Sequence, residues 1–232
     1  AVVARRIVEF ISKTVAIDNH EFRVTPSIGI AIFPDDGHSA ETLLKNADLA
    51  MYFSKRKGPG NFKYYQESMN DSALKRLTIE NQLQHAIERD ELHLHYQPQV
   101  DLPSGNLIGM EALLRWDNPE LGSVSPIEFI PVAEECGLII SIGEWVLRNA
   151  CIQAKKWLEK NLSIPRIAVN VSIKQFTHPN FIGMVEEILA ETGLPGERLE
   201  IEITESLLAQ NTNEISKILR ELKSRCVHIA VD

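Results

Sequence analysis

A carboxylate and a guanidinium share one face of a short strand near the middle of the chain. The segment is Glu111-Ala112-Leu113-Leu114-Arg115-Trp116. Because side chains alternate along a strand, Glu111 and Arg115 point to the same side. At about 3.3 Å per residue, the two lie roughly 13 Å apart. That separation is too long for an ion pair, but it suits a metal ligand and a phosphate clamp that serve one extended ligand.

Further oxygen-bearing side chains stand near the ends of later strands. Asn170, Glu202 and Asp232 end or follow apolar segments and are spaced 32 and 30 residues apart. Together with Glu111 they supply three carboxylates and one amide. Oxygen ligands of this kind suit Mg²⁺ or Mn²⁺ rather than zinc. We interpret these four residues as a candidate divalent-metal site.

A solvated strand face is the alternative explanation for these acids. Glu200, Glu202 and Thr204 share one face of their strand, and water is the usual partner of such a row. In a barrel, however, one face points into the interior and the other packs on helices, so neither is freely solvated. The residue types alone do not decide between a divalent-metal site and a solvated strand face.

Two histidines, His93 and His95, also alternate on one strand face. A His-x-His pair can bind zinc, but no thiol or third histidine stands at ligand spacing. Polar positions at the surface or between domains explain the pair better.

Composition narrows the classes of function. With 232 residues, 44% of them hydrophobic, the chain can bury a core. A net charge of −8 argues against a general nucleic-acid-binding surface, although an acidic site can bind phosphates through divalent metals. Cys136, Cys151 and Cys226 form no Cys-x-x-Cys pair, which indicates reduced core thiols in a cytoplasmic protein. The sequence contains no run of about 18 apolar residues, so it predicts no membrane-spanning segment.

Three successive units are predicted, over residues 1–66, 67–90 and 91–232. The first contains a helix over residues 1–14 and a strand run over 22–33. After a turn, it continues with a helix capped by Ser39 and a short strand from Phe62. The second unit is a charged connecting helix with apolar residues facing inward at Leu74, Leu77, Leu83 and Ile87.

The third unit begins with a hairpin and continues as repeated strand–helix pairs. Turn-forming residues 101–106 separate strands over 92–100 and 107–116. Ser125 and Glu128 form a predicted capping box for a helix that begins at Pro126 and ends near Gly137. A helix over 143–160 follows, then strands over 167–172, 199–204 and 226–232 alternate with helices over 181–191 and 214–224.

Repeats of about 30 residues favour a parallel (β/α)₈ barrel, whose active sites lie at the carboxyl ends of the strands. An open doubly wound sheet is the alternative, but it gives no reason for acids on successive strand ends. The predicted class is therefore α/β, with a partial barrel in the third unit.

Five ordered motifs over residues 91–232 resemble the EAL domain, a family of metal-dependent phosphodiesterases that hydrolyse cyclic di-GMP. They are Tyr96-Gln97-Pro98, Glu111-Ala112-Leu113-Leu114-Arg115-Trp116, Pro126-x-x-Phe129-Ile130-Pro131, Asn170-Val171-Ser172 and Glu202-Ile203-Thr204-Glu205. The resemblance implies an irregular TIM-like barrel and a site that uses two Mg²⁺ or Mn²⁺ ions.

Residue roles follow from the same resemblance. The metal ligands it implies are Glu111, Asn170, Glu202 and Asp232, and the substrate-contacting residues are Gln97, Leu114 and Arg115. The catalytic residues it implies are Glu111, Glu202, Asp232 and Glu205, of which Glu205 supports a loop after the next strand.

The upstream unit resembles the C-terminal half of a GGDEF domain, the diguanylate cyclase fold, and this resemblance implies a partial α+β domain before the barrel. The matching segments are Ser27-Ile28-Gly29-Ile30-Ala31 and Ala47-Asp48-Leu49-Ala50-Met51-Tyr52-Phe53-Ser54-Lys55. The motif that names that family is not in the chain.

The resemblance implies hydrolysis of cyclic di-GMP to the linear dinucleotide pGpG in bacterial second-messenger signalling. We expect cyclic di-GMP as the partner, no nucleic acid, and a homodimer through the EAL domain. The buried strand at 226–232 suggests a chain cut within a domain, so this fragment is expected to be inactive. The alternatives are a non-catalytic cyclic di-GMP receptor and a structural dimerisation module.

Overall fold

The computed structural model describes residues 1–17, 20–56, 58, 60–162, 164–205 and 213–231. These residues form two compact units, Ala1–Thr78 and Ile79–Asp232. We describe each unit by itself.

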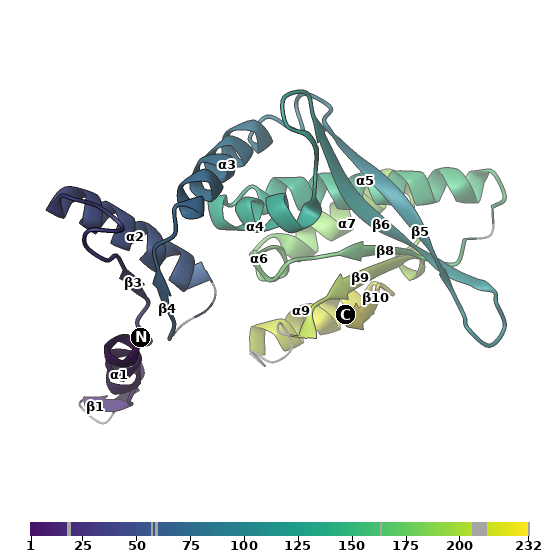
Figure 1. Ribbon diagram of the computed structural model, residues 1–232. Helices are drawn as coiled ribbons and strands as arrows, with labels where there is room; N and C mark the ends of the chain where they lie inside the picture. Colours follow the sequence, from purple (N-terminus) through teal and green to yellow (C-terminus); the bar gives the residue numbers. More distant parts are fainter. Residues whose placement is uncertain (18–19, 57, 59, 163, 206–212, 232) are drawn as a thin grey trace. The chain divides into compact units, whose positions relative to one another are not determined.

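The first unit pairs short strands with two longer helices (Figure 1). Strands β1 and β2 form an antiparallel pair, and β3 and β4 form a parallel pair that packs on α2. The elements are α1 (Val2–Ile11), β1 (Val15–Ile17), β2 (His20–Phe22), β3 (Ile28–Ile30), α2 (Ala40–Arg56) and β4 (Phe62–Tyr64).

The start of α2 agrees with the sequence prediction. The backbone N–H of Thr42 donates to Ser39 Oγ over 3.1 Å, so Ser39 caps the helix. The single strand expected over residues 22–33 is wrong, because β2 ends at Phe22 and β3 begins only at Ile28. Pro26 lies between them, and a proline cannot donate to a strand ladder.

The predicted connecting helix is observed as α3 (Ser68–Leu83), which ends earlier than expected. Leu83 is buried, as predicted, at 2% exposure. Leu74 and Leu77 were expected to face inward, but they are 66% and 57% exposed. The buried apolar residues of this helix are Met69, Ile79 and Leu83, so its inward face differs from the predicted one.

The second unit is built on one curved sheet with the strand order β10-β9-β8-β6-β5. Strands β6, β8, β9 and β10 are parallel, β5 pairs antiparallel with β6, and the short β7 also pairs with β6. The strands are β5 (Leu92–Val100), β6 (Leu107–Asn118), β7 (Gly122–Val124), β8 (Ile167–Asn170), β9 (Leu199–Ile203) and β10 (His228–Val231).

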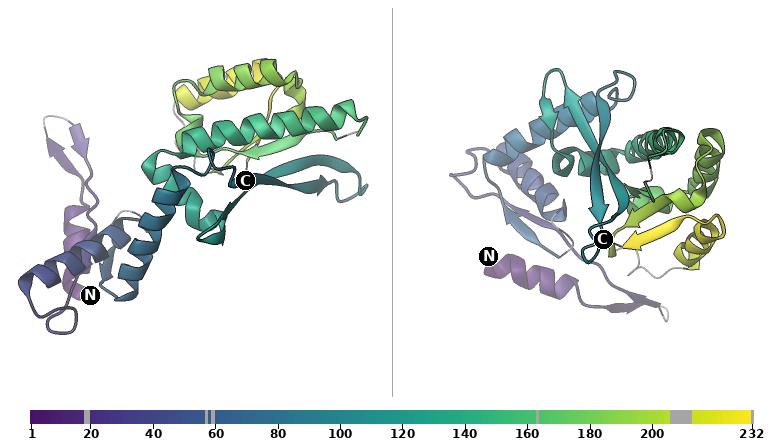
Figure 2. Two further views of the ribbon diagram at one scale, coloured as in Figure 1. Left: turned by 90° about the horizontal axis from the view of Figure 1, so that it is seen from above. Right: turned by 90° about the vertical axis from the view of Figure 1, so that its right-hand side faces the viewer.

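Helices cover the outer face of this sheet. In the right-hand view of Figure 2 the strands curve around an interior, with α5, α7 and α9 outside them. The elements are α4 (Pro126–Cys136), α5 (Ile139–Glu159), α6 (Ile173–Phe176), α7 (Phe181–Thr192), η1 (Gly196–Arg198) and α9 (Asn213–Ser224). The predicted hairpin and parallel strand–helix repeats are confirmed, and the arrangement is an incomplete βα barrel.

Two local predictions in this unit need correction. Gly137 ends α4 in the left-handed conformation, as expected, at φ 86°. Ser125 occupies the N-cap position, but its side chain makes no capping hydrogen bond, so the predicted capping box does not form. Of the three cysteines expected in a core, only Cys151 is buried. Cys136 and Cys226 are exposed because they lie at a helix end and in a turn.

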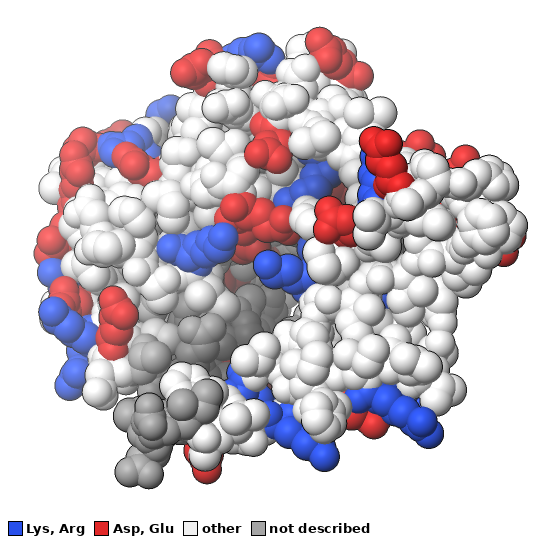
Figure 3. Space-filling view, turned by 90° about the vertical axis from the view of Figure 1, so that its left-hand side faces the viewer, with Lys and Arg blue, Asp and Glu red and all other residues white. Residues whose placement is uncertain are grey.

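Charges of both signs are interspersed on the face shown in Figure 3. Among the described residues, that face carries no continuous basic surface. No helix within the described ranges has the length and apolarity that crossing a bilayer requires.

Candidate functional site

Strand β6 presents two different faces. Ala112 and Trp116 are buried at 3% and 0% exposure and belong to the core, whereas Glu111 and Arg115 are half-buried on the opposite face. This is the alternation that the sequence predicted. Leu114 packs partly into the core, and its carbonyl oxygen accepts a hydrogen bond from Arg115 Nη1 over 2.8 Å. The backbone therefore orients the guanidinium.

Strand β5 adds polar side chains beside this face. Its register places Gln97 opposite Glu111 and His93 opposite Arg115. The rings of His93 and His95 lie 5.1 Å apart, and His93 Nε2 is 3.5 Å from Asp117 Oδ2. The two histidines thus flank the Arg115 end of the row.

A hydrogen bond joins β6 to the end of β8. Asn170, the last residue of β8, donates from Nδ2 to Glu111 Oε1 over 2.7 Å. Asn170 is also in register with Glu202 on β9. Three neighbouring strands therefore bring together Glu111, Asn170 and Glu202, which are far apart in the sequence.

The two acids on β9 have different partners. Glu200 forms an ion pair with Arg166 at 2.6 Å, which balances its charge. Glu202 lies nearer the carboxyl end of the strand and accepts a hydrogen bond from Gln99 Nε2 over 3.0 Å. Glu111 and Glu202 line one pocket of about 230 Å³ together with Gln99, Ala230 and Val231. Two carboxylates thus share a single opening.

Two further residues predicted for the site are Glu205 and Asp232. Glu205 is exposed just after β9. Asp232 lies outside the described residues, although β10, which leads to it, pairs with β9. Across the described ranges, no three His, Cys, Asp or Glu side chains gather into a group that could hold a metal ion. The set is two carboxylates and the Asn170 amide, and this oxygen chemistry fits Mg²⁺ or Mn²⁺.

A second pocket of about 290 Å³ adjoins the carboxylates. Its polar rim includes Arg115, Asn170, Glu202 and Thr204. Its apolar lining comes from the end of β6 and from α4 and α5: Ala112, Leu113, Leu114, Pro126, Ile130, Ile139, Ile142, Gly143 and Val146. A flat apolar group could pack in this pocket while a charged group meets Arg115.

The loop after β8 is fixed by Ser172, the last residue of the Asn170-Val171-Ser172 motif, and by two residues that the sequence analysis did not single out, Gln175 and Gly143. Ser172 and Gln175 form a reciprocal capping box at the start of α6. Gln175 is 5% exposed, and a Cβ on Gly143 would stand 1.5 Å from its Nε2. Gly143 therefore leaves room for Gln175, which holds the loop that follows Asn170.

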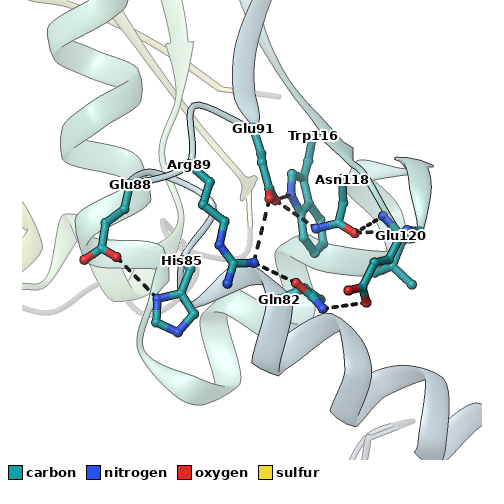
Figure 4. A network of polar contacts seen from close by, with 9 residues as sticks. Gln82, His85, Glu88, Arg89, Glu91, Trp116, Asn118 and Glu120 are labelled. Carbon is teal, nitrogen blue, oxygen red and sulfur yellow. Dashed lines mark hydrogen bonds and ion pairs between the residues drawn. The ribbon is translucent and has the colours of Figure 1, made fainter.

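A buried carboxylate anchors the far end of β6 (Figure 4). Glu91 is 6% exposed, and its Oε2 accepts hydrogen bonds of 2.9 Å from Trp116 Nε1 and Asn118 Nδ2. Arg89 Nη1 lies 3.9 Å from Glu91 Oε1 and donates to Gln82 over 2.9 Å. The strand that carries Glu111 and Arg115 is thus tied to the segment that leads into β5.

Family models match the chain in two places. The model described as "EAL domain" matches residues 80–232, about two-thirds of the chain. The chain belongs to the EAL-domain family. The model described as "Diguanylate cyclase, GGDEF domain" matches residues 1–61. The chain therefore has a GGDEF-type segment followed by an EAL-type segment.

Curated relatives are similar to this protein along the whole chain. The bifunctional diguanylate cyclase/cyclic di-GMP phosphodiesterase MucR of Pseudomonas aeruginosa is 41% identical over 232 residues, which are 100% of this chain and 34% of that protein. The cyclic di-GMP phosphodiesterase NbdA of the same species is 32% identical over 100% of this chain and 30% of its own length. The chain thus spans about a third of these relatives.

Solved EAL structures share the fold. The PaMucR phosphodiesterase in complex with c-di-GMP has a TM-score of 0.65 and 41% identity, over 67% of this chain and 63% of that one. The EAL enzyme Bd1971, with cAMP and cyclic-di-GMP bound, has a TM-score of 0.64 and 27% identity, over 84% and 51%. The EAL family is a phosphodiesterase family with a TIM-barrel-like fold, and the incomplete barrel described above is part of it.

Proposed function

We propose that the EAL-type segment binds cyclic di-GMP and, in the presence of Mg²⁺ or Mn²⁺, takes part in its hydrolysis to linear pGpG. The observation that carries the proposal is the gathering of Glu111, Asn170 and Glu202 beside the pocket that Arg115 borders. The names of the relatives support the same substrate.

The metal would be held by oxygen donors on neighbouring strands. Glu111, Asn170 and Glu202 are the described candidates, and we propose Asp232 as a fourth. A divalent cation at this position supplies Lewis-acid chemistry, which activates a water and balances charge on the phosphate.

The chain's own residues have separate roles in this proposal. Arg115 pairs with a phosphate oxygen and Gln97 donates to the ligand, while Leu114 belongs to the apolar wall against which a base packs. Asn170 holds Glu111 through its amide hydrogen. Glu205 supports the loop after the following strand.

The surrounding organisation is proposed on the same basis. We propose a GGDEF-like part over residues 1–66, a connecting segment over 67–90 and the EAL part over 91–232. A cytoplasmic location is proposed from the three cysteines, which are unpaired thiols.

Two other functions make different predictions. A receptor would bind cyclic di-GMP without turnover, and a dimerisation module would have no affinity for it. The carboxylate pair in one pocket favours the hydrolase, because a receptor gains nothing from two acids that repel an anionic ligand.

The deciding experiment measures binding and turnover separately. Calorimetry with cyclic di-GMP, with and without Mn²⁺, measures binding to the 232-residue chain, and chromatography detects linear pGpG. The described residues supply ligands for one ion, so we expect metal-dependent binding without multiple turnover. We expect turnover in a protein that also carries ligands for the second ion.

The control is Glu197→Gln, which makes the same change on an exposed residue of η1. It should bind like wild type, whereas Glu111→Gln should lose the metal dependence. Binding that ignores both the metal and Glu111 would favour the receptor, and no binding at all would favour the dimerisation module.

A further inference from the structure

Gln99 reaches across the interior of the curved sheet to a residue proposed as a metal ligand. It lies on β5, two residues after Gln97 and therefore on the same face. In the sheet order, β6 and β8 lie between β5 and β9. Even so, Gln99 Nε2 donates to Glu202 Oε1 over 3.0 Å. The contact spans the interior because the sheet curves.

The neighbouring strand makes room for this side chain. Gly109 is the cross-strand partner of Gln99, and a Cβ at Gly109 would stand 2.7 Å from Gln99 Oε1. The register also shifts between Gln99 and Val100. Bulges of this kind re-aim side chains next to functional sites. The missing side chain at Gly109 therefore leaves the space in which Gln99 extends toward Glu202.

The chemistry of the contact differs from that of the adjacent acid. Glu200 is paired with a full positive charge on Arg166 at 2.6 Å. Glu202 accepts a hydrogen bond from the neutral amide of Gln99, and this contact orients the carboxylate without adding a positive charge. A carboxylate that must attract a cation needs this second kind of partner.

We propose that Gln99 is a positioning residue that fixes Glu202 in the orientation that binds a divalent cation. The proposal rests on the proposed function, in which Glu202 is a metal ligand. Without the amide, the half-buried carboxylate gains rotamer freedom and can turn away from Glu111, whose charge repels it. Partners that orient metal ligands in this way typically change metal affinity about 10- to 100-fold when they are removed.

The first test measures Mn²⁺ affinity of the purified chain by electron paramagnetic resonance or calorimetry. Gln99→Met keeps a side chain of similar length but removes the donor, and we expect Mn²⁺ binding to weaken about 10-fold. The melting temperature of the metal-free protein should stay unchanged. The control Gln84→Met makes the same substitution on an exposed glutamine after α3 and should leave the affinity unchanged.

The second test uses Gly109. Gly109→Ala should displace the Gln99 side chain and weaken Mn²⁺ binding as Gln99→Ala does. In the Gln99→Ala background the added methyl group no longer meets that side chain, so the double variant should bind Mn²⁺ as the single Gln99→Ala variant does. Full additivity of the two losses would overturn the assignment, because it would show that Gly109 acts independently of Gln99.

Glu202→Gln separates this inference from the proposed function. A wild-type protein that lacks Mn²⁺ affinity, or whose affinity ignores Glu202→Gln, would overturn the proposed metal site and the role of Gln99 with it. If Glu202→Gln weakens binding while Gln99→Met does not, only the role of Gln99 is wrong. Tighter binding in Gln99→Met would also overturn it, since the amide would then compete with the ion.

Discussion

Glu111 and Glu202 stand on strands separated by β8, yet both line one pocket. Two negative charges at one opening repel each other unless a cation balances them. Asn170 donates a hydrogen bond to Glu111, and Gln99 donates one to Glu202. Both donors are neutral amides, so these two contacts orient the acids without adding a positive charge.

Glu111→Gln removes one of these charges while keeping its shape. We expect loss of metal-dependent cyclic di-GMP binding and, where the site is complete, of hydrolysis, with an unchanged melting temperature. The fold should persist because a glutamine oxygen can still accept the hydrogen bond from Asn170. Calorimetry measures the metal-dependent binding, and thermal unfolding measures the melting temperature. Turnover by the variant at the wild-type rate would show that Glu111 is not a ligand of the proposed metal site.

Arg115→Ala tests the proposed role of Arg115 in binding a phosphate. A charge-assisted hydrogen bond contributes about 1.5–3 kcal/mol, so cyclic di-GMP should bind about 10- to 100-fold more weakly. Titration calorimetry measures the change, and Arg220→Ala on α9 is the exposed control. If Arg115→Ala and wild type bind cyclic di-GMP equally well, Arg115 does not bind the phosphate. Its role would then be structural, through its hydrogen bond to the Leu114 carbonyl oxygen.

The thiols differ in reactivity because they differ in burial. Burial raises the pKa of Cys151 to about 12, so almost no reactive thiolate is present at pH 8 in the folded protein. We expect a thiol reagent to modify Cys136 and Cys226 in the native state and all three cysteines in denaturant. Raising the pH toward 12 should make Cys151 reactive. Modification of Cys151 at pH 8 as fast as the other two would contradict its buried position.

At the scale of elements, β6 is the support of the site, and both of its ends are held. Glu91 accepts the hydrogen bonds of Trp116 and Asn118 at one end, while Met110 and Ala112 pair with β8 toward the other. Trp116 also packs edge-on against Phe129 of α4, with ring centroids 5.5 Å apart. The packing of Trp116 on α4 therefore helps to fix the position of Arg115, its neighbour on β6.

Glu91→Ala should destabilise the second unit. It leaves the N–H groups of Trp116 and Asn118 buried without their acceptor, at a cost of about 2–4 kcal/mol. Glu91→Gln should cost less, because its amide oxygen can replace Oε2. Urea unfolding followed by tryptophan fluorescence measures both variants. Equal losses would show that the charge matters more than the two hydrogen bonds.

At the scale of the whole molecule, the chain has two compact units. The main core cluster extends from Ile79 to Val227 and lies within the second unit. All three tryptophans, Trp116, Trp145 and Trp157, also belong to that unit. Fluorescence therefore reports on one unit, while circular dichroism reports on the helices of both.

We expect the two signals to give different unfolding curves in urea. Circular dichroism should record loss of α1 and α2 at a denaturant concentration at which tryptophan fluorescence is still native-like, because the first unit is smaller and exposes Val3 and Phe10 at 71% and 74%. The single variant Glu91→Ala should shift the fluorescence curve and the second phase of the circular dichroism curve, which reports on the helices of the second unit, and leave the first phase unchanged. Superimposable wild-type curves would show that the two units unfold together.

Local periodicity was sufficient for much of the fold. Alternation placed Glu111 and Arg115 on one face, Gly137 marked the end of α4, and the turn residues 101–106 predicted the β5–β6 hairpin. Each of these depends on neighbours within a few residues. The same rules missed the break at Pro26 and overstated the capping role of Ser125.

Contacts between distant strands were decided only by the tertiary structure. Residue types and spacing predicted oxygen donors near strand ends, and the resemblance to the EAL domain implied Gln97, but neither was used to single out Gln99. Strand alternation could have flagged Gln99, since it shares the face of Gln97. Its bond to Glu202, the bond from Asn170 to Glu111 and the burial of Glu91 depend on register and curvature, which set the distance between residues far apart in the chain.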